Sequence, residues 1–104
     1  MEIRWTETAL SDLSGIYEFI SHDSFVYAGR VAENLLKAAD RIGTFPKIGR
    51  RIPEFDDDRV REVLVGSHRI MYSIGDSFVH IVTIIHGSRD VLRHVSNDDF
   101  VFDE

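Results

Sequence analysis

Residues 60–86 read VREVLVGSHRIMYSIGDSFVHIVTIIH, and this stretch decides the fold. Three runs within it, residues 60–65, 68–74 and 78–86, are rich in β-branched and aromatic residues, and glycine-containing turns separate them. Such runs are typical of strands that short turns connect. We therefore predict three consecutive strands, each of which pairs antiparallel with the next one along the chain.

The turn between the second and third runs predicts a register. Gly75-Asp76 suits a two-residue hairpin turn with glycine first, which places Tyr72 opposite Val79 and Ile74 opposite Ser77. Opposed residues point to the same face of a sheet. The face expected to carry the core then holds Ile70, Tyr72, Ile74, Val79, Ile81, Thr83 and Ile85. The opposite face, expected to be partly open, holds Arg69, Met71, Ser73, Phe78, His80, Val82, Ile84 and His86. In this arrangement Arg69 should be more exposed than Tyr72.

Two helical patterns precede the strands. Apolar residues recur at helical spacing over residues 9–20 and again over residues 28–42, and only a few residues separate the two segments. This favours an antiparallel pair of amphipathic helices. The expected end residues are Thr6 or Thr8 and Asp23 or Ser24 as N-caps, and Gly43 as the residue that follows the second helix.

The order of these segments predicts the fold class. Residues 2–5 alternate in character and predict a short first strand, whereas residues 44–58 hold both prolines and predict an ordered loop. We predict an α+β fold in which the N-terminal short strand and the αα-hairpin pack on one face of a small antiparallel β-sheet. We expect residues 1–104 to form a single domain, with an acidic C-terminal tail at about residues 96–104.

Composition narrows the classes of function. The 104 residues contain no cysteine, which rules out a disulfide framework, a thiolate nucleophile and a zinc site with cysteine ligands. No apolar run approaches the roughly 20 residues of a membrane span, and the first residues do not have the pattern of a signal peptide. We therefore expect a cytoplasmic protein that does not bind a membrane.

The net charge of −6 hides a positive segment. An excess of 18 acidic over 12 basic residues disfavours general coating of nucleic acid. Residues 59–97, however, hold five arginines against three acidic residues, and four of the five histidines lie there. Arginine suits phosphate and carboxylate, so a local anion site remains possible. The acidic tail is a candidate shield for these arginines until a partner displaces it.

Four motifs span most of the chain. They read Ala9-x-x-Asp12-Leu13-x-x-Ile16-Tyr17-x-x-Ile20, Ile42-Gly43-x-Phe45-Pro46-x-x-Gly49-Arg50, His68-Arg69-Ile70-x-Tyr72-x-Ile74 and Val82-x-x-Ile85-His86-Gly87-x-Arg89-Asp90. In this order and spacing they resemble the RelE/ParE superfamily, the toxins of bacterial type II toxin–antitoxin systems. The second and fourth motifs are more similar to the ParE branch, which includes plasmid stabilisation proteins.

The resemblance implies an activity and a partner. A ParE-like toxin inhibits DNA gyrase by protein binding and has no catalytic residues of its own, whereas a RelE-like toxin cleaves messenger RNA on the ribosome by general acid–base chemistry. Either would be neutralised by a cognate antitoxin in a hetero-oligomer. We expect a gyrase inhibitor first, a ribosome-dependent mRNA endonuclease second, and an inactive relative that serves only as an interaction domain third.

A ribonuclease would use Arg69, Arg89 and His94. By resemblance, Arg69 matches the arginine of the family's strand motif and Arg89 matches the arginine after the last strand. His94 is the candidate proton donor or acceptor, because no tyrosine follows Tyr72 to match the one that ribonuclease members usually have there. We predict no cofactor and no metal site, since the two histidines of the last strand would lie roughly 20 Å apart.

The residues expected to bind the target or the antitoxin are mostly basic or apolar. They are Arg50, Arg61, Arg69, Met71, Phe78, His80, His86 and Arg89. Apolar groups on the predicted open face, together with Phe100 and Phe102 of the tail, would be poorly placed in water. We therefore expect something to cover this face, either an antitoxin segment that folds on binding or the tail itself.

Overall fold

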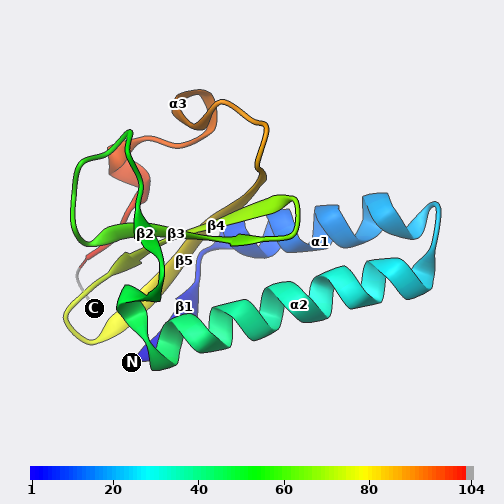
Figure 1. Cartoon of the computed structure of the whole chain (residues 1–104), viewed down its shortest axis with the longest axis horizontal. Coiled ribbons are helices and arrows are strands. Elements are labelled where there is room, and N and C mark those ends of the chain that lie inside the picture. The colour runs from blue at the N-terminus through cyan, green and yellow to red at the C-terminus, as the bar shows by residue number, and fades with distance from the viewer. Residues whose placement is uncertain (103–104) are drawn as a thin grey trace.

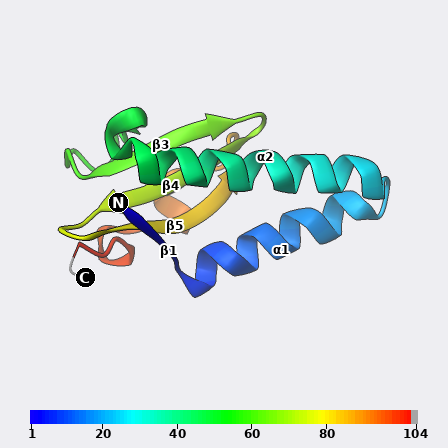
Figure 2. The ribbon, with the colours of Figure 1, turned by 90° about the horizontal axis from the view of Figure 1, so that it is seen from below.

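The computed structural model describes residues 1–102 and shows two helices packed on one face of a five-stranded sheet (Figures 1 and 2). The elements in chain order are β1 (Glu2–Trp5), α1 (Glu7–Ser21), α2 (Phe25–Thr44), the 3₁₀ helix η1 (Pro46–Ile48), β2 (Arg50–Arg51), β3 (Val60–Val65), β4 (His68–Ile74), β5 (Phe78–His86), α3 (Val91–His94) and the 3₁₀ helix η2 (Asn97–Asp99). The predicted fold class is confirmed. In the described part of the chain, no helix combines the length and apolar character needed to cross a bilayer.

The strand order in the sheet is β1-β5-β4-β3-β2. The strands β3, β4 and β5 pair antiparallel as predicted, whereas β1 lies parallel to β5 and makes the sheet mixed. A parallel neighbour needs a long connection, and here the chain between β1 and β5 runs through both helices and then through β2, β3 and β4. The crossover leaves both helices on one face of the sheet, and Figure 2 shows them extending beyond the ends of the strands.

Side-chain caps begin both helices, as predicted. The Thr6 hydroxyl accepts a hydrogen bond from the Ala9 N–H at 3.1 Å, and the Ser24 hydroxyl accepts one from the Tyr27 N–H at 3.1 Å. Each cap satisfies one of the backbone donors that a helix leaves unpaired at its start. Thr6 also donates its hydroxyl to the Val82 carbonyl at 2.8 Å, which ties the start of α1 to β5.

Gly43 lies inside α2, and its predicted place after the helix is wrong. The helix runs to Thr44, and Phe45 caps its end. Gly43 is buried, and a Cβ atom there would lie 2.8 Å from two carbons of the Ile3 side chain. The glycine is therefore needed because α2 approaches β1 closely, rather than because the chain turns.

The register between β4 and β5 is two residues away from the predicted one. Ile74 pairs with Val79 instead of Ser77, because the connection is longer than a two-residue turn. Gly75 closes this connection by donating its N–H to the Phe78 carbonyl at 2.9 Å. A shift of two residues keeps each side chain on its predicted face, so the assignment of faces survives near the turn.

A β-bulge further along the same pair of strands reverses the faces. Tyr72 pairs with Ile81, but Met71 pairs with Thr83, so β5 holds one extra residue at this point. Beyond the bulge, Ile84 packs in the core under the helices and Ile85 packs on the far face of the sheet, the reverse of the prediction. The bulge was missed because both strands alternate without an obvious interruption.

The sheet carries a core on each face. On the helix side, Leu35, Ile42, Ile70 and Ile81 are fully buried. The far face carries a second cluster, made of Ile52, Phe55, Val60, Met71, Val82, Val91, Val95 and Phe100. The loop before β3 and the segment after β5 close over this face (Figure 1). The prediction of a partly open face is therefore wrong.

The tail itself covers the far face, which is one of the two covers that we expected. Ser73 donates its hydroxyl to the Val101 carbonyl at 2.6 Å, and the Phe100 ring packs edge-on against Phe55 with 5.2 Å between centroids. The Phe102 ring lies 3.8 Å from the Arg59 guanidinium carbon, a cation–π contact. The last two acidic residues of the predicted shield, 103 and 104, lie outside the described residues.

Candidate functional site

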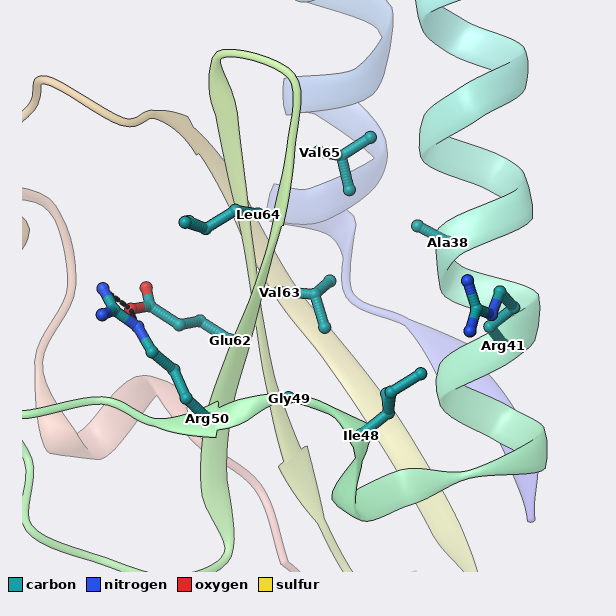
Figure 3. Close-up of a pocket in the computed structure, with 9 residues that line it drawn as sticks. All are labelled: Ala38, Arg41, Ile48, Gly49, Arg50, Glu62, Val63, Leu64 and Val65. Carbon is teal, nitrogen blue, oxygen red and sulfur yellow. Dashed lines mark hydrogen bonds and ion pairs between the residues drawn. The ribbon is translucent and has the colours of Figure 1, made fainter.

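A buried ion pair lies on the far face of the sheet. Glu62 on β3 is fully buried, and its Oε1 accepts a hydrogen bond from Arg69 Nε on β4 at 2.6 Å. Its other oxygen, Oε2, accepts from Arg50 Nε on β2 at 2.7 Å (Figure 3). A buried carboxylate needs such partners because desolvation of an unpaired charge is costly. The prediction that Arg69 is more exposed than Tyr72 holds, but the exposed fractions are only 9% and 0%.

Arg61 holds the loop before β3 in place. Its side chain is largely buried and donates to Asp58 Oδ1 at 2.8 Å and to the Gly49 carbonyl at 2.9 Å. Each of these bonds pulls the 49–58 segment onto the sheet. Of the arginines predicted to bind a partner, Arg61 is thus the one most fully engaged within the protein, while Arg50 keeps 61% of its side chain exposed.

Tyr72 belongs to the core, as predicted. Its hydroxyl donates to the Pro46 carbonyl at 2.6 Å and accepts the Gly49 N–H at 2.9 Å. Burial raises the pKa of this phenol above its ordinary value of 10.0. A Cβ atom at Gly49 would lie 2.6 Å from the hydroxyl oxygen, so only glycine lets the chain pass this close. The tyrosine therefore positions β2, and with it Arg50.

Of the residues predicted to bind a partner, Met71 and His80 are buried, and Phe78 already contacts another residue of this chain. Met71 is fully buried, and His80 is nearly so, because the tail and the loop before β3 cover the face they share. Within residues 1–102, the His80 Nε2 has no hydrogen-bond partner. Phe78 is half-buried, and its ring centroid lies 3.6 Å from the Arg4 guanidinium carbon. Met71 and His80 cannot meet a partner while the tail stays in place.

Three histidine side chains line a cleft at the end of the sheet. His68 on β4 pairs with His86 on β5, and their ring centroids lie 5.8 Å apart. The cleft has a volume of about 750 Å³, and Arg89 and His94 line it beside the two paired histidines. Burial lowers the pKa of His68 below its ordinary value of 6.5, and the nearby charge of His86 lowers it further.

The opposite wall of this cleft comes from the helical hairpin. Ile16, Phe19 and Ile20 of α1 line it, and Tyr27 of α2 adds an aromatic ring. The only acidic side chain among the described lining residues, Asp12, accepts hydrogen bonds from the Thr83 hydroxyl at 2.6 Å and from the Ile84 N–H at 3.0 Å. The cleft is therefore apolar on one wall and basic on the other.

The structure separates Arg69 from the other two residues of the predicted ribonuclease set. Arg89 and His94 share the histidine cleft, whereas Arg69 lines an adjacent hollow of about 380 Å³ together with Arg50. His68 and His86 line both hollows, so the two form one continuous surface at this end of the sheet.

Sequence reasoning missed the roles of two residues near these hollows, His68 and Glu62. The predicted register does not place His68 beside His86, and only the observed register does so. Glu62 was overlooked as a partner for arginine. It pairs with Met71, which lies two residues from Arg69 on β4 and therefore on the same face of the sheet. Strand alternation places Glu62 and Arg69 on the same face only once the register between β3 and β4 is known.

Comparison with known proteins finds a matching family and a similar protein of known name. Residues 3–91 match the family described as the ParE toxin of the type II toxin–antitoxin system parDE. Toxin RelE2 of Caulobacter vibrioides is 37% identical over 89 residues, which are 85% of this chain and 97% of the relative.

Two solved structures share the fold. The chromosomal ParDE toxin–antitoxin system from P. aeruginosa superposes with a TM-score of 0.69 at 17% identity, over 83% of this chain and 95% of that one. The toxin–antitoxin complex RelBE2 from Mycobacterium tuberculosis superposes with a TM-score of 0.61 at 20% identity, over 82% of this chain and 95% of that one.

Proposed function

The chain belongs to the ParE toxin family and is the toxin of a type II toxin–antitoxin system; from that premise, we propose that it inhibits DNA gyrase by binding it rather than by cleaving RNA. Gyrase acts in the cytoplasm, so the proposal keeps the toxin there. A cognate antitoxin would neutralise it by forming a complex, the kind of assembly to which the two structurally similar proteins belong.

The ion pair between Arg69 and Glu62 is the observation that carries this proposal. A ribonuclease that makes the 2′-hydroxyl attack a phosphate needs a cation to stabilise the charge that develops on the phosphorane. In this chain Glu62 already neutralises Arg69, with 2.6 Å between the two side chains and the carboxylate fully buried. Releasing Arg69 toward a phosphate would leave that carboxylate with only one arginine in a dry site.

A RelE-like endonuclease is the second candidate, and the histidine cleft favours it. His68, His86 and His94 lie around one cavity with Arg89, which supplies the proton carriers and a cation that RNA transesterification needs. Within residues 1–102, the Arg89 side chain has no hydrogen-bond or ion-pair partner, so its charge is available. This candidate therefore rests on Arg89 and the imidazoles, with Arg69 in the adjacent hollow.

Two assays on the purified protein distinguish the candidates. We expect the wild-type protein to inhibit gyrase supercoiling and to leave messenger RNA intact on programmed ribosomes. The variant Arg89→Ala tests the cleft, and Arg30→Ala is its matched control, because Arg30 is an exposed arginine on α2 that does not line the cleft.

Cleavage of messenger RNA that Arg89→Ala abolishes and Arg30→Ala retains, with supercoiling unaffected, would overturn the proposal in favour of the ribonuclease. If neither assay responds although an antitoxin co-purifies, the protein is an inactive relative that serves as an interaction domain.

A further inference from the structure

Two histidines lie side by side at one end of the sheet, beneath the helical hairpin that extends beyond the strands (Figure 2). His68 begins β4 and His86 ends β5, and the two are paired directly across the strands. Two residues further in, Ile70 and Ile84 are also paired, and both are buried in the core under the helices. Side chains two residues apart share a face of the sheet, so the histidine pair continues this core row at its open end.

The spacing of the two rings is close to that of a shared metal ion. The prediction of no metal site considered His80 and His86, which are far apart along one strand. His68 comes instead from the neighbouring strand, and its ring centroid lies 5.8 Å from that of His86. Two imidazoles that bind one zinc ion tetrahedrally, each with about 2.0–2.1 Å between nitrogen and metal, have their centroids about 5 Å apart.

The orientation of the rings needs only a small adjustment. The two ring planes are 77° apart, so the edge of one ring faces the other ring. The torsion about the Cβ–Cγ bond of histidine is broad. Either ring can therefore turn at little cost until both direct a nitrogen at one point between the strands.

The nitrogens that a metal would need are not otherwise engaged. Within residues 1–102, the His68 ring makes no hydrogen bond, and the hydrogen bonds of the His86 ring all involve Nδ1. Nδ1 lies 2.7 Å from the Ser88 hydroxyl, and when it donates its proton there, Nε2 carries the free lone pair. Metal-binding histidines commonly donate their second nitrogen in this way.

The protonation state of His68 also suits a metal. An imidazole must be neutral to bind a metal ion. Burial lowers the pKa of His68 below its ordinary value of 6.5, and the nearby charge of His86 lowers it further. His68 is therefore neutral at pH 7, and no proton has to leave it before a metal binds.

The surroundings leave room for the rest of a coordination shell. Both rings line the histidine cleft of about 750 Å³ and the adjacent hollow of about 380 Å³. In the part of the chain that the structure describes, no group of three histidine, cysteine, aspartate or glutamate side chains could hold a metal. Water would therefore take the remaining positions. Ile16 and Ile20 give the cleft an apolar wall, and Asp12 and Arg89 line it with opposite charges.

We propose that His68 and His86 together bind one divalent transition-metal ion of the zinc type, with Nε2 of His86 as one ligand atom and water completing the coordination. Imidazole is a good ligand for zinc, copper and nickel, whereas Mg²⁺ prefers oxygen ligands. An anion beside Arg89 is the other occupant that this surface could hold, but it would need protonated imidazoles, which the burial of His68 disfavours.

Titration of the untagged protein with Zn²⁺, followed by NMR of the histidine ring nitrogens, tests the site directly. We expect one ion per chain to bind saturably and to cause its largest shifts at His68 and His86, while Mg²⁺ causes none. Zinc binding that leaves these two rings unchanged would be that of an adventitious ion only, and would overturn the proposal.

Calorimetric titration of variants measures what each ring contributes. His68→Gln and His86→Gln should each weaken zinc binding at least about tenfold, because a single imidazole remains. His22→Gln is the matched control, since His22 is an exposed histidine that lines neither hollow, and it should bind zinc as the wild-type protein does. Equal dissociation constants for all four proteins would contradict the proposal.

A pair of serine variants tests the ligand atom of His86. The Ser88 N–H is also placed to donate to Nδ1, at 3.2 Å, so without the hydroxyl the ring proton stays on Nε2 and must leave before zinc binds. Ser88→Ala should therefore weaken zinc binding at least about threefold. Ser67→Ala removes a serine that lines the same two hollows and should change nothing. Equal affinities for these two variants would overturn the assignment of Nε2.

Thermal unfolding with zinc or with inorganic phosphate separates the two possible occupants. Zinc that stabilises the wild-type protein but not His86→Gln would support the proposal, because only a ligand of the folded state raises the unfolding temperature. Phosphate that stabilises the protein and shifts both rings, where zinc does neither, would make the pair an anion site and overturn it. These readouts use the toxin alone, so their outcome is independent of the gyrase and ribosome assays.

Discussion

At the scale of single residues, Glu62 has the most consequential environment in this protein. One fully buried carboxylate joins three strands, because β3 carries it while β4 and β2 supply its two arginines. The same contacts that stabilise the sheet also neutralise the charge of Arg69. On the proposal of gyrase inhibition, this charge serves the structure.

Glu62→Gln should lower the free energy of unfolding by about 3 kcal/mol, because it leaves Arg69 largely buried without its counter-charge. Arg50→Ala removes one of the two partners of the buried carboxylate but leaves Arg69 in place, so we expect a smaller loss of about 1–2 kcal/mol. Urea unfolding at neutral pH measures both values. Similar losses in the two variants would show that the Arg69–Glu62 contact is not the main one.

His68 should make the stability of the protein depend on pH. Its folded pKa lies below the ordinary value of 6.5, owing first to burial and then to the charge of His86. Between the two pKa values the unfolded state binds more protons, so the free energy of unfolding falls as the pH drops below about 6.5 and stops falling below the folded pKa. His68 is only partly buried, so the effect is modest.

Urea unfolding at about pH 7.5 and at about pH 5.5 tests this dependence. The variant His68→Gln should lose less stability between the two conditions than the wild-type protein does. Equal losses would contradict the assignment to His68.

At the scale of elements, α2 combines two glycines with opposite roles. Gly43 is buried where the helix meets β1, whereas Gly29 is exposed and a Cβ atom there would find nothing within 4 Å. The spacing of apolar residues predicts the helix but does not distinguish these two positions. Only the packing of α2 against Ile3 gives Gly43 its role.

Alanine substitution at the two glycines should have opposite effects. Gly43→Ala should destabilise the protein by about 1–3 kcal/mol, because its Cβ would overlap the Ile3 side chain. Gly29→Ala should stabilise it by about 0.5–1 kcal/mol, because alanine favours the helix and meets no neighbour. Thermal unfolding of both variants checks the prediction, and a stabilising Gly43→Ala would contradict it.

At the scale of the whole molecule, the tail converts a one-sided sheet into a three-layered one. The helices cover one face, and the segment from α3 to Phe102 covers the other. This second cover hides Met71 and His80, which were expected to face a partner. The basic groups that stay accessible lie at the end and at the outer edge of the sheet, around the histidine cleft and Arg41.

The aromatic side chain of Phe100 should contribute most of what the tail adds to stability. Phe100→Ala should cost about 3 kcal/mol, because Phe100 is buried in the far-face cluster against Phe55. Val101→Ala changes an exposed side chain while keeping the carbonyl that Ser73 binds, and should cost less than about 1 kcal/mol. Chemical unfolding compares the two, and a small loss for Phe100→Ala would mean that the tail is held weakly.

The extent to which the sequence predicted the structure differs between residues. Thr6 and Ser24 were expected as caps and are caps, because a cap depends on neighbours three residues away. Ile84 and Ile85 were assigned to the wrong faces, because one bulge reverses every face beyond it. His68 was missed as a partner of His86 for a related reason, since cross-strand neighbours follow from the register.

The sequence by itself determined the features that arise from local spacing: the two helices, the three antiparallel strands, the α+β class and the resemblance to the toxin family. Tertiary structure alone decided which face of the sheet is covered, that β1 pairs parallel with β5, and that Arg69 is neutralised while Arg89 is accessible. The physical reason is range. Periodicity and caps depend on residues a few positions apart, whereas burial and ion pairing depend on segments that the chain brings together from far along its length.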